Sequence, residues 1–116
     1  MNLVRLERHQ HPRPPHHELR LSRAFDSGVR YVGDVENLYV DNDNNLHFMD
    51  VVTSGFLGLV KKHHLVPVEA ITGESPGQIT LGVDQQAVEG APTFSNPKAA
   101  PDEELQRSTR EHYGYG

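Results

Sequence analysis

Four histidines lie close together near the start of the chain and offer nitrogen ligands for a metal ion: His9, His11, His16 and His17. A structural zinc site needs four converging ligands that their surroundings hold in place. Prolines at positions 12, 14 and 15 lie among these histidines, and such a segment favours an extended, solvated backbone. We therefore expect no built metal site and no cofactor, while weak binding of Zn, Ni or Cu by this segment stays open as an alternative.

A second pair of histidines, His63 and His64, lies in the middle of the chain. If this stretch is a strand, the two side chains point to opposite faces of the sheet. One of them can then be buried, but both cannot easily hold the same ion.

The acidic and amide run from Asp41 to Asn45 begins like a calcium loop, because it offers hard oxygen ligands at alternating positions. The pattern then fails, since Leu46 stands where a glycine is needed and Val52 where a bidentate Glu is needed. Asn and Asp tolerate left-handed backbone, so the run predicts a hairpin turn.

Catalysis by a nucleophile or by paired carboxylates is hard to build from this sequence. The chain has no cysteine and no Gly-x-Ser-x-Gly turn, which excludes a thiolate nucleophile and the hydrolase elbow. Asp34 and Glu36 share a face of a candidate strand, but like charges at a hairpin are usually solvated. We expect a protein that is not an enzyme and has no small-molecule substrate.

Length and charge narrow the class of protein further. A chain of 116 residues has room for one domain with tails. Its net charge of -5 argues against binding to nucleic acid. No apolar run approaches the roughly 18 residues of a membrane span, and the first residues lead into Glu and His rather than a signal-peptide core. We expect a cytoplasmic protein.

The amino-acid composition divides the chain into three segments. Residues 1–18 are rich in His and Pro and predict a flexible, disordered arm. Residues 19–92 consist of short apolar runs separated by Gly, Asn and Asp, which indicates strands and turns. The candidate strands are Leu19–Ser22, Val35–Asp41, Leu46–Thr53, His64–Ile71 and Gln78–Val83, with a turn at Gly73–Gly77 before the last. So many short strands favour a small closed barrel, because closure removes exposed edges.

Residues 93–116 predict a linker, a short helix and an aromatic tail. Pro101 suits the first position of a helix, and the acidic residues after it suit the positive end of the helix dipole. Leu105 is almost the only large apolar residue before Tyr113. The helix therefore has little to bury and is expected to be marginal alone.

The ordered set of segments in residues 19–92 resembles the PRC-barrel domain. The segments are Val32–Asp41, Gly55–Gly58, Leu65–Ile71 and Gln85–Pro92, and Glu111–Tyr115 resembles the tail of some stand-alone members. The domain also occurs in the H subunit of photosynthetic reaction centres and in the ribosome-maturation factor RimM. The resemblance implies an all-β, PRC-type barrel that serves in assembly or interaction, and it implies no catalytic residue.

These observations predict a non-enzymatic module that self-associates or docks on a larger bacterial complex. The candidate partner-binding residues are apolar or aromatic: Phe56, Leu57, Leu59, Tyr113 and Tyr115. The three loop residues alternatively fold back and plug the end of the barrel. An RNA- or ribosome-associated maturation factor is the rival function, which the resemblance suggests and the charge disfavours.

Overall fold

The two longest apolar stretches form the two longest strands of the structure. β3 (Tyr31–Val40) and β4 (Leu46–Ser54) pair antiparallel as a hairpin. In the turn between them, Asp41 Oδ1 accepts hydrogen bonds from the backbone N–H groups of Asp43 and Asn45. Asn44 takes a left-handed φ of 63°, which Asn tolerates. The predicted hairpin is confirmed.

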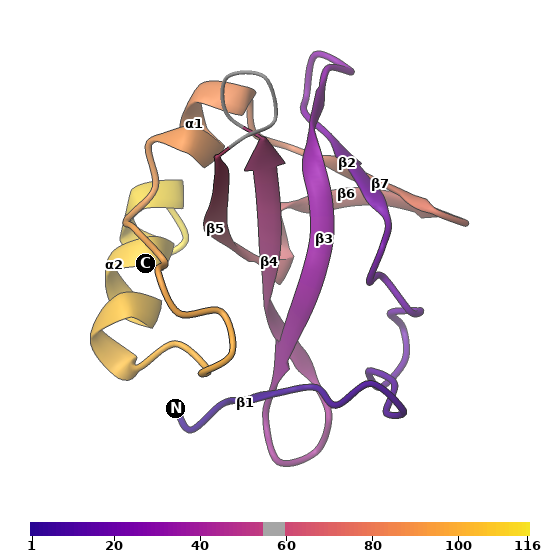
Figure 1. The fold of residues 1–116 in the computed structure, drawn as a ribbon, viewed down its shortest axis with the longest axis vertical. Helices are drawn as coiled ribbons and strands as arrows, with labels where there is room; N and C mark the ends of the chain where they lie inside the picture. Colours follow the sequence, from indigo (N-terminus) through magenta and orange to yellow (C-terminus); the bar gives the residue numbers. More distant parts are fainter. Residues whose placement is uncertain (55–59) are drawn as a thin grey trace.

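The computed structural model describes residues 1–54 and 60–116, and a mixed sheet is its main element (Figure 1). The other strands in these residues are β1 (Val4–Arg5), β2 (Arg23–Phe25), β5 (Lys61–Pro67), β6 (Ile71–Ser75) and β7 (Gln78–Leu81). They lie in the order β5–β4–β3–β2–β7–β6, and β1 pairs with β3. The β2–β7 pair is parallel and the remaining pairs are antiparallel.

Two of the other predicted strands differ from the structure. Leu19–Ser22 is not a strand, because Leu21 takes a left-handed φ of 70° and turns the chain before β2 begins. His64–Ile71 is divided by a 3-10 helix, η2 (Val68–Ala70), so that β5 ends at Pro67 and β6 begins at Ile71. The predicted turn before the last strand is confirmed, with Gly77 at a φ of 74° between β6 and β7.

Two α-helices follow the sheet in the chain. α1 (Gln85–Glu89) was not predicted, although Asp84 caps it by accepting the N–H of Ala87. α2 (Glu103–Tyr113) starts later than Pro101, because Asp102 is its N-cap. α2 packs against β5 and buries the polar side chains of Gln106 and Thr109. The prediction from sequence counted only apolar residues and therefore expected this helix to bury little. No helix in the described residues is long and apolar enough to cross a membrane.

The sheet is not closed into a barrel, and this part of the sequence prediction is wrong. β5 and β6 occupy the two ends of the strand order and do not pair in the described residues. Pro67 has no N–H to give to a ladder, and η2 turns the chain immediately after it. α1 and α2 contact β5 instead, and a bridge joins His64 to Thr93 (Figure 1). Helices thus cover the β5 edge of the sheet, whereas the sequence had predicted that barrel closure would remove this edge.

The apolar residues form two clusters, one on each face of the β3–β4–β5 sheet. The larger cluster contains Val35, Met49 and Val51, and the smaller contains Phe48 and Leu65. Since side chains alternate along a strand, Asp50 of β4 lies on the same face as Phe48. A carboxylate is therefore placed among buried apolar residues.

Residues 1–18, expected as a flexible arm, run along the sheet in the structure. β1 pairs with β3, and Leu3 and Leu6 are buried. The guanidinium of Arg20 donates hydrogen bonds to the backbone carbonyls of Leu6, Glu7 and Gln10. Five N–H donors in one planar group let a single side chain bind several carbonyls at once. The prediction weighed the prolines and histidines of this segment and gave no weight to its leucines.

Replacing Gly33 by Ala tests the close contact between β3 and β4. A Cβ at Gly33 would lie 2.2 Å from the carbonyl oxygen of Val52, so the backbone has to move. We expect the free energy of unfolding to fall by about 1–3 kcal/mol in Gly33→Ala. In the control, Gly28→Ala, the nearest atom would be 3.4 Å away, and we expect a change within about 0.5 kcal/mol. Urea unfolding followed by circular dichroism measures both, and equal stability of the two variants would contradict the described contact.

Candidate functional site

A bulge in the middle of β3 rearranges the side chains beside the buried carboxylate. Val35 pairs with Val51 and Asn37 pairs with Asp50, so Glu36 is an extra residue without a partner on β4. A bulge re-aims the side chains next to it. In this way Glu36 and Asn37 both come close to Asp50.

Asp50 is fully buried, and two neighbouring side chains hold its carboxylate. Asn37 Nδ2 donates to Oδ2 at 2.9 Å, and His63 Nδ1 lies 3.0 Å from both carboxylate oxygens. Burial raises the pKa of Asp50, and the hydrogen bonds from Asn37 and His63 oppose this effect. One ligand atom from each of Glu36, Asp50 and His63 lies within 4.8 Å of the others. We call these three residues the carboxylate–histidine cluster.

The two adjacent histidines of β5 face opposite sides of the sheet, as predicted. His63 contacts Asp50 and is partly exposed, whereas His64 is buried on the other face and its Nε2 lies 3.0 Å from Thr53 Oγ1. Burial lowers the pKa of His64, because it disfavours the charged imidazole. Only His63 can therefore take part in a site on the Asp50 face.

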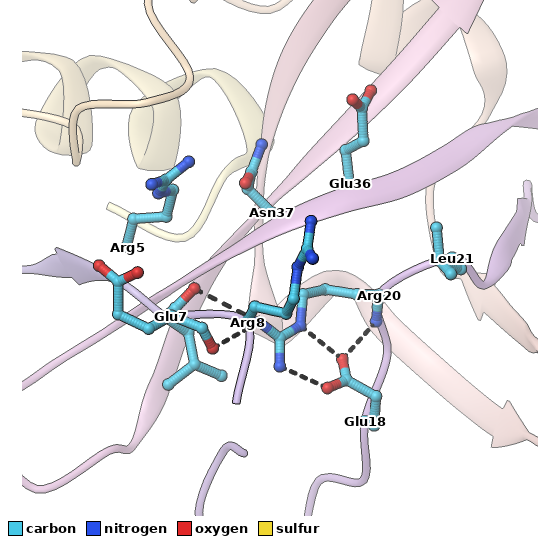
Figure 2. A pocket seen from close by; sticks show the side chains of 9 residues that line it. Arg5, Glu7, Arg8, Glu18, Arg20, Leu21, Glu36 and Asn37 are labelled. Carbon is cyan, nitrogen blue, oxygen red and sulfur yellow. Dashed lines mark hydrogen bonds and ion pairs between the residues drawn. The ribbon is translucent and has the colours of Figure 1, made fainter. Parts of the chain in front are cut away.

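An open cavity of about 750 Å³ lies beside the bulge, between β3 and the N-terminal segment. Figure 2 shows Glu36 and Asn37 on β3, with the Arg8 side chain pointing toward this part of the strand. Arg20, also on the cavity wall, is engaged by Glu18 and by backbone carbonyls. Arg5 and Arg8 form no ion pair within the described part of the chain. The cavity is thus lined by the side chains of Arg5 and Arg8 and, of the carboxylate–histidine cluster, by Glu36.

A second surface of interest lies on β2 and the start of β3. The Arg23 guanidinium carbon lies 5.5 Å from the ring centre of Phe25 and 4.9 Å from that of Tyr31, and the two rings meet edge to face at 6.0 Å. Val29, on the turn that joins these strands, is 77% exposed, and Tyr31 is 46% exposed. We call Arg23, Phe25, Val29 and Tyr31 the aromatic patch.

The turn that carries Val29 is held by a buried carboxylate. Asp26 Oδ1 accepts the N–H groups of Gly28 and Arg30, and Oδ2 accepts that of Gln85 at the start of α1. The hydrogen bond from Arg30 is the main cause of a lowered pKa at Asp26. Val29 has a left-handed φ of 63°, which is costly for a β-branched residue. The turn therefore displays an apolar side chain where Asn or Gly would fit the backbone better.

Of the five residues that the sequence singled out for partner binding, the structure describes two. Phe56, Leu57 and Leu59 lie outside the described residues. Tyr113 and Tyr115 are half-buried and pack against the larger apolar cluster, and the Tyr113 hydroxyl is buried. These two tail residues lie at the end of α2, away from the aromatic patch (Figure 1).

The four N-terminal histidines do not come together as ligands. His9, His11 and His17 are exposed, and His16 Nδ1 lies 2.8 Å from Glu74 of β6. Within residues 1–54 and 60–116, none of them belongs to a group of three ligand atoms like the carboxylate–histidine cluster. Of the two carboxylates on β3, Asp34 accepts the hydroxyl of Tyr31, whereas Glu36 lies close to Asp50.

Sequence reasoning missed Asp50 and the aromatic patch. A signal for Asp50 was present, because an aspartate in the otherwise apolar stretch Phe48–Val52 is buried and needs a partner. The bulge that brings Glu36 to Asp50 has no comparable signal. The aromatic patch depends on pairing between β2 and β3. The sequence had predicted the strand before β3 at Leu19–Ser22, whereas β2 is Arg23–Phe25.

Comparisons with known proteins add no relative from which residue roles could be taken. No protein-family model matches the chain, and a search of curated proteins found no significant match. The candidate sites therefore rest on their own geometry.

The burial of His64 predicts a pH-dependent contribution to stability. Because the folded-state pKa lies below the ordinary value of 6.5, the unfolded chain binds more protons between these two values. The contribution is fully present above the unfolded pKa and is lost as pH falls through the folded pKa. We expect acidification from neutral pH to about pH 5 to destabilise the wild type more than His64→Gln, which does not titrate. Urea unfolding at several pH values measures this, and identical pH slopes in both proteins would contradict the lowered pKa of His64.

Proposed function

We propose that this protein is a non-enzymatic interaction module related to the PRC-barrel family, with its sheet left open, and that the aromatic patch is its docking surface. The observation that carries the proposal is an exposed apolar side chain, Val29, on a fixed turn beside two aromatic rings and an arginine. Tyr and Arg are enriched among the residues that carry most of the binding energy of protein interfaces, and Tyr buries a large area at low entropic cost.

Val29 shares an exposed side chain and a left-handed backbone with Leu21, but Val29 alone belongs to the aromatic patch with Arg23, Phe25 and Tyr31. A left-handed backbone costs roughly 1–2 kcal/mol for an ordinary residue, and an exposed valine gains no burial within its own chain. Contact with a partner would bury the side chain and offset this cost. The proposed occupant is a protein surface, either of a second copy or of a larger complex, as the resemblance to assembly domains suggests.

The tail residues are weaker candidates for docking than the sequence suggested. Tyr113 packs against the apolar cluster, and burial raises the pKa of its hydroxyl. Its replacement would loosen α2 as well as any interface. A test of docking therefore needs residues whose loss leaves the fold intact.

Val29→Asn with Tyr31→Ser provides such a test. Asn tolerates the left-handed backbone at position 29, and both side chains are exposed, so the fold should be retained. We expect this double variant to lose at least about tenfold in affinity for its partner, as hot-spot residues do. Native mass spectrometry of the protein isolated gently from its source cells, with analytical ultracentrifugation of the purified chain, identifies the complex and measures the loss.

Leu21→Asn is the matched control. Leu21 is also exposed, at 84%, and also has a left-handed φ of 70°, but it lies outside the aromatic patch. This variant should keep full affinity. A monomer at every concentration and in cell extracts, or a complex that survives in the double variant, would contradict the proposal. Salt-dependent RNA binding would favour the rival maturation-factor function instead.

A further inference from the structure

We infer that the carboxylate–histidine cluster, Glu36, Asp50 and His63, is a binding site for a divalent transition-metal ion of the zinc type. The inference is independent of the proposed docking function, because it concerns the Asp50 face of β4 and β5 and uses no residue of the aromatic patch. It also differs from the weak binding that the N-terminal histidines suggested.

The spacing of the three ligand atoms suits one ion. Two ligands about 2.1 Å from a zinc ion, at angles of about 90° to 110°, lie roughly 3.0 to 3.4 Å apart. His63 Nδ1 lies 3.0 Å from each Asp50 oxygen, and Glu36 completes a group within 4.8 Å. Glu36 is exposed on a bulge, so its side chain can rotate by the small amount that coordination requires.

The donor types and their support also suit such an ion. One imidazole nitrogen and two carboxylates form a set that binds zinc or manganese and leaves a position for water. Asn37 fixes Asp50 through Oδ2 in the manner of an outer-shell partner. Asp50 is buried and has a second carboxylate close by, so a divalent cation would neutralise charge that the fold otherwise holds at a cost.

Other histidine–carboxylate pairs show what distinguishes this cluster. His47 Nε2 lies 2.9 Å from Asp41 Oδ2, and His16 pairs with Glu74. In the described residues neither pair has a third ligand atom within reach, whereas the cluster at Asp50 does. The bulge at Glu36 supplies that third ligand. Glu36 is exposed and the His63 side chain is partly exposed, so an ion can reach the cluster from solvent.

Isothermal titration of the full chain with Zn²⁺ tests the site. We expect the wild type to bind one ion that Glu36→Gln and His63→Gln bind at least about tenfold more weakly. Zn²⁺ should also raise the Tm of the wild type by mass action and raise that of the two variants much less. Glu36→Gln removes one charge from an exposed side chain, so it is expected to fold.

Three control variants separate this site from general effects. Glu7→Gln makes the same charge change on the same cavity, and His47→Gln removes a histidine that pairs with Asp41 alone among the described acidic residues. Replacing His9, His11 and His17 by Asn removes the exposed N-terminal histidines. All three controls should keep the one-ion site. Loss of binding in the N-terminal variant, or equal affinity in Glu36→Gln and Glu7→Gln, would overturn the inference.

Discussion

The ladder between β3 and β4 is the constraint on which the rest of the structure depends. β3 also pairs with β1 and β2, so its position sets the N-terminal segment, the cavity and the aromatic patch. Gly33 permits the close approach of the two strands, and the bulge at Glu36 interrupts their register. One irregular residue in the central strand thus decides which polar groups meet Asp50.

The alternation of side chains along β4 and β5 distributes polar groups between two environments. Burial lowers the pKa of His64, whose Nε2 lies 3.0 Å from Thr53 Oγ1 on the larger apolar face, whereas His63 contacts a carboxylate near solvent. Adjacent residues of the same type therefore have different chemistry, because each strand presents successive residues to opposite faces. The same rule puts Asp50 beside Phe48 and Leu65, where a charge needs partners.

Local patterns predicted the parts of the fold that depend on neighbours in sequence. The hairpin of β3 and β4 and the turn at Gly77 follow from apolar runs and turn residues. The parallel β2–β7 pair, the open sheet and the carboxylate–histidine cluster depend on contacts between distant segments. Leu21 shows the limit clearly: an alternating pattern predicted a strand where the chain turns. Asp50 could have been singled out from its apolar neighbours, but Glu36 as its companion could not.

The parallel pairing of β2 with β7 has a consequence for how the chain folds during synthesis. The β3–β4 hairpin consists of contacts between near neighbours and can form as soon as its residues leave the ribosome. β2 can pair with β3 at that stage, but its other edge has no partner until β7 has been made. During that interval the backbone of β2 is an open edge, which other nascent chains can pair with.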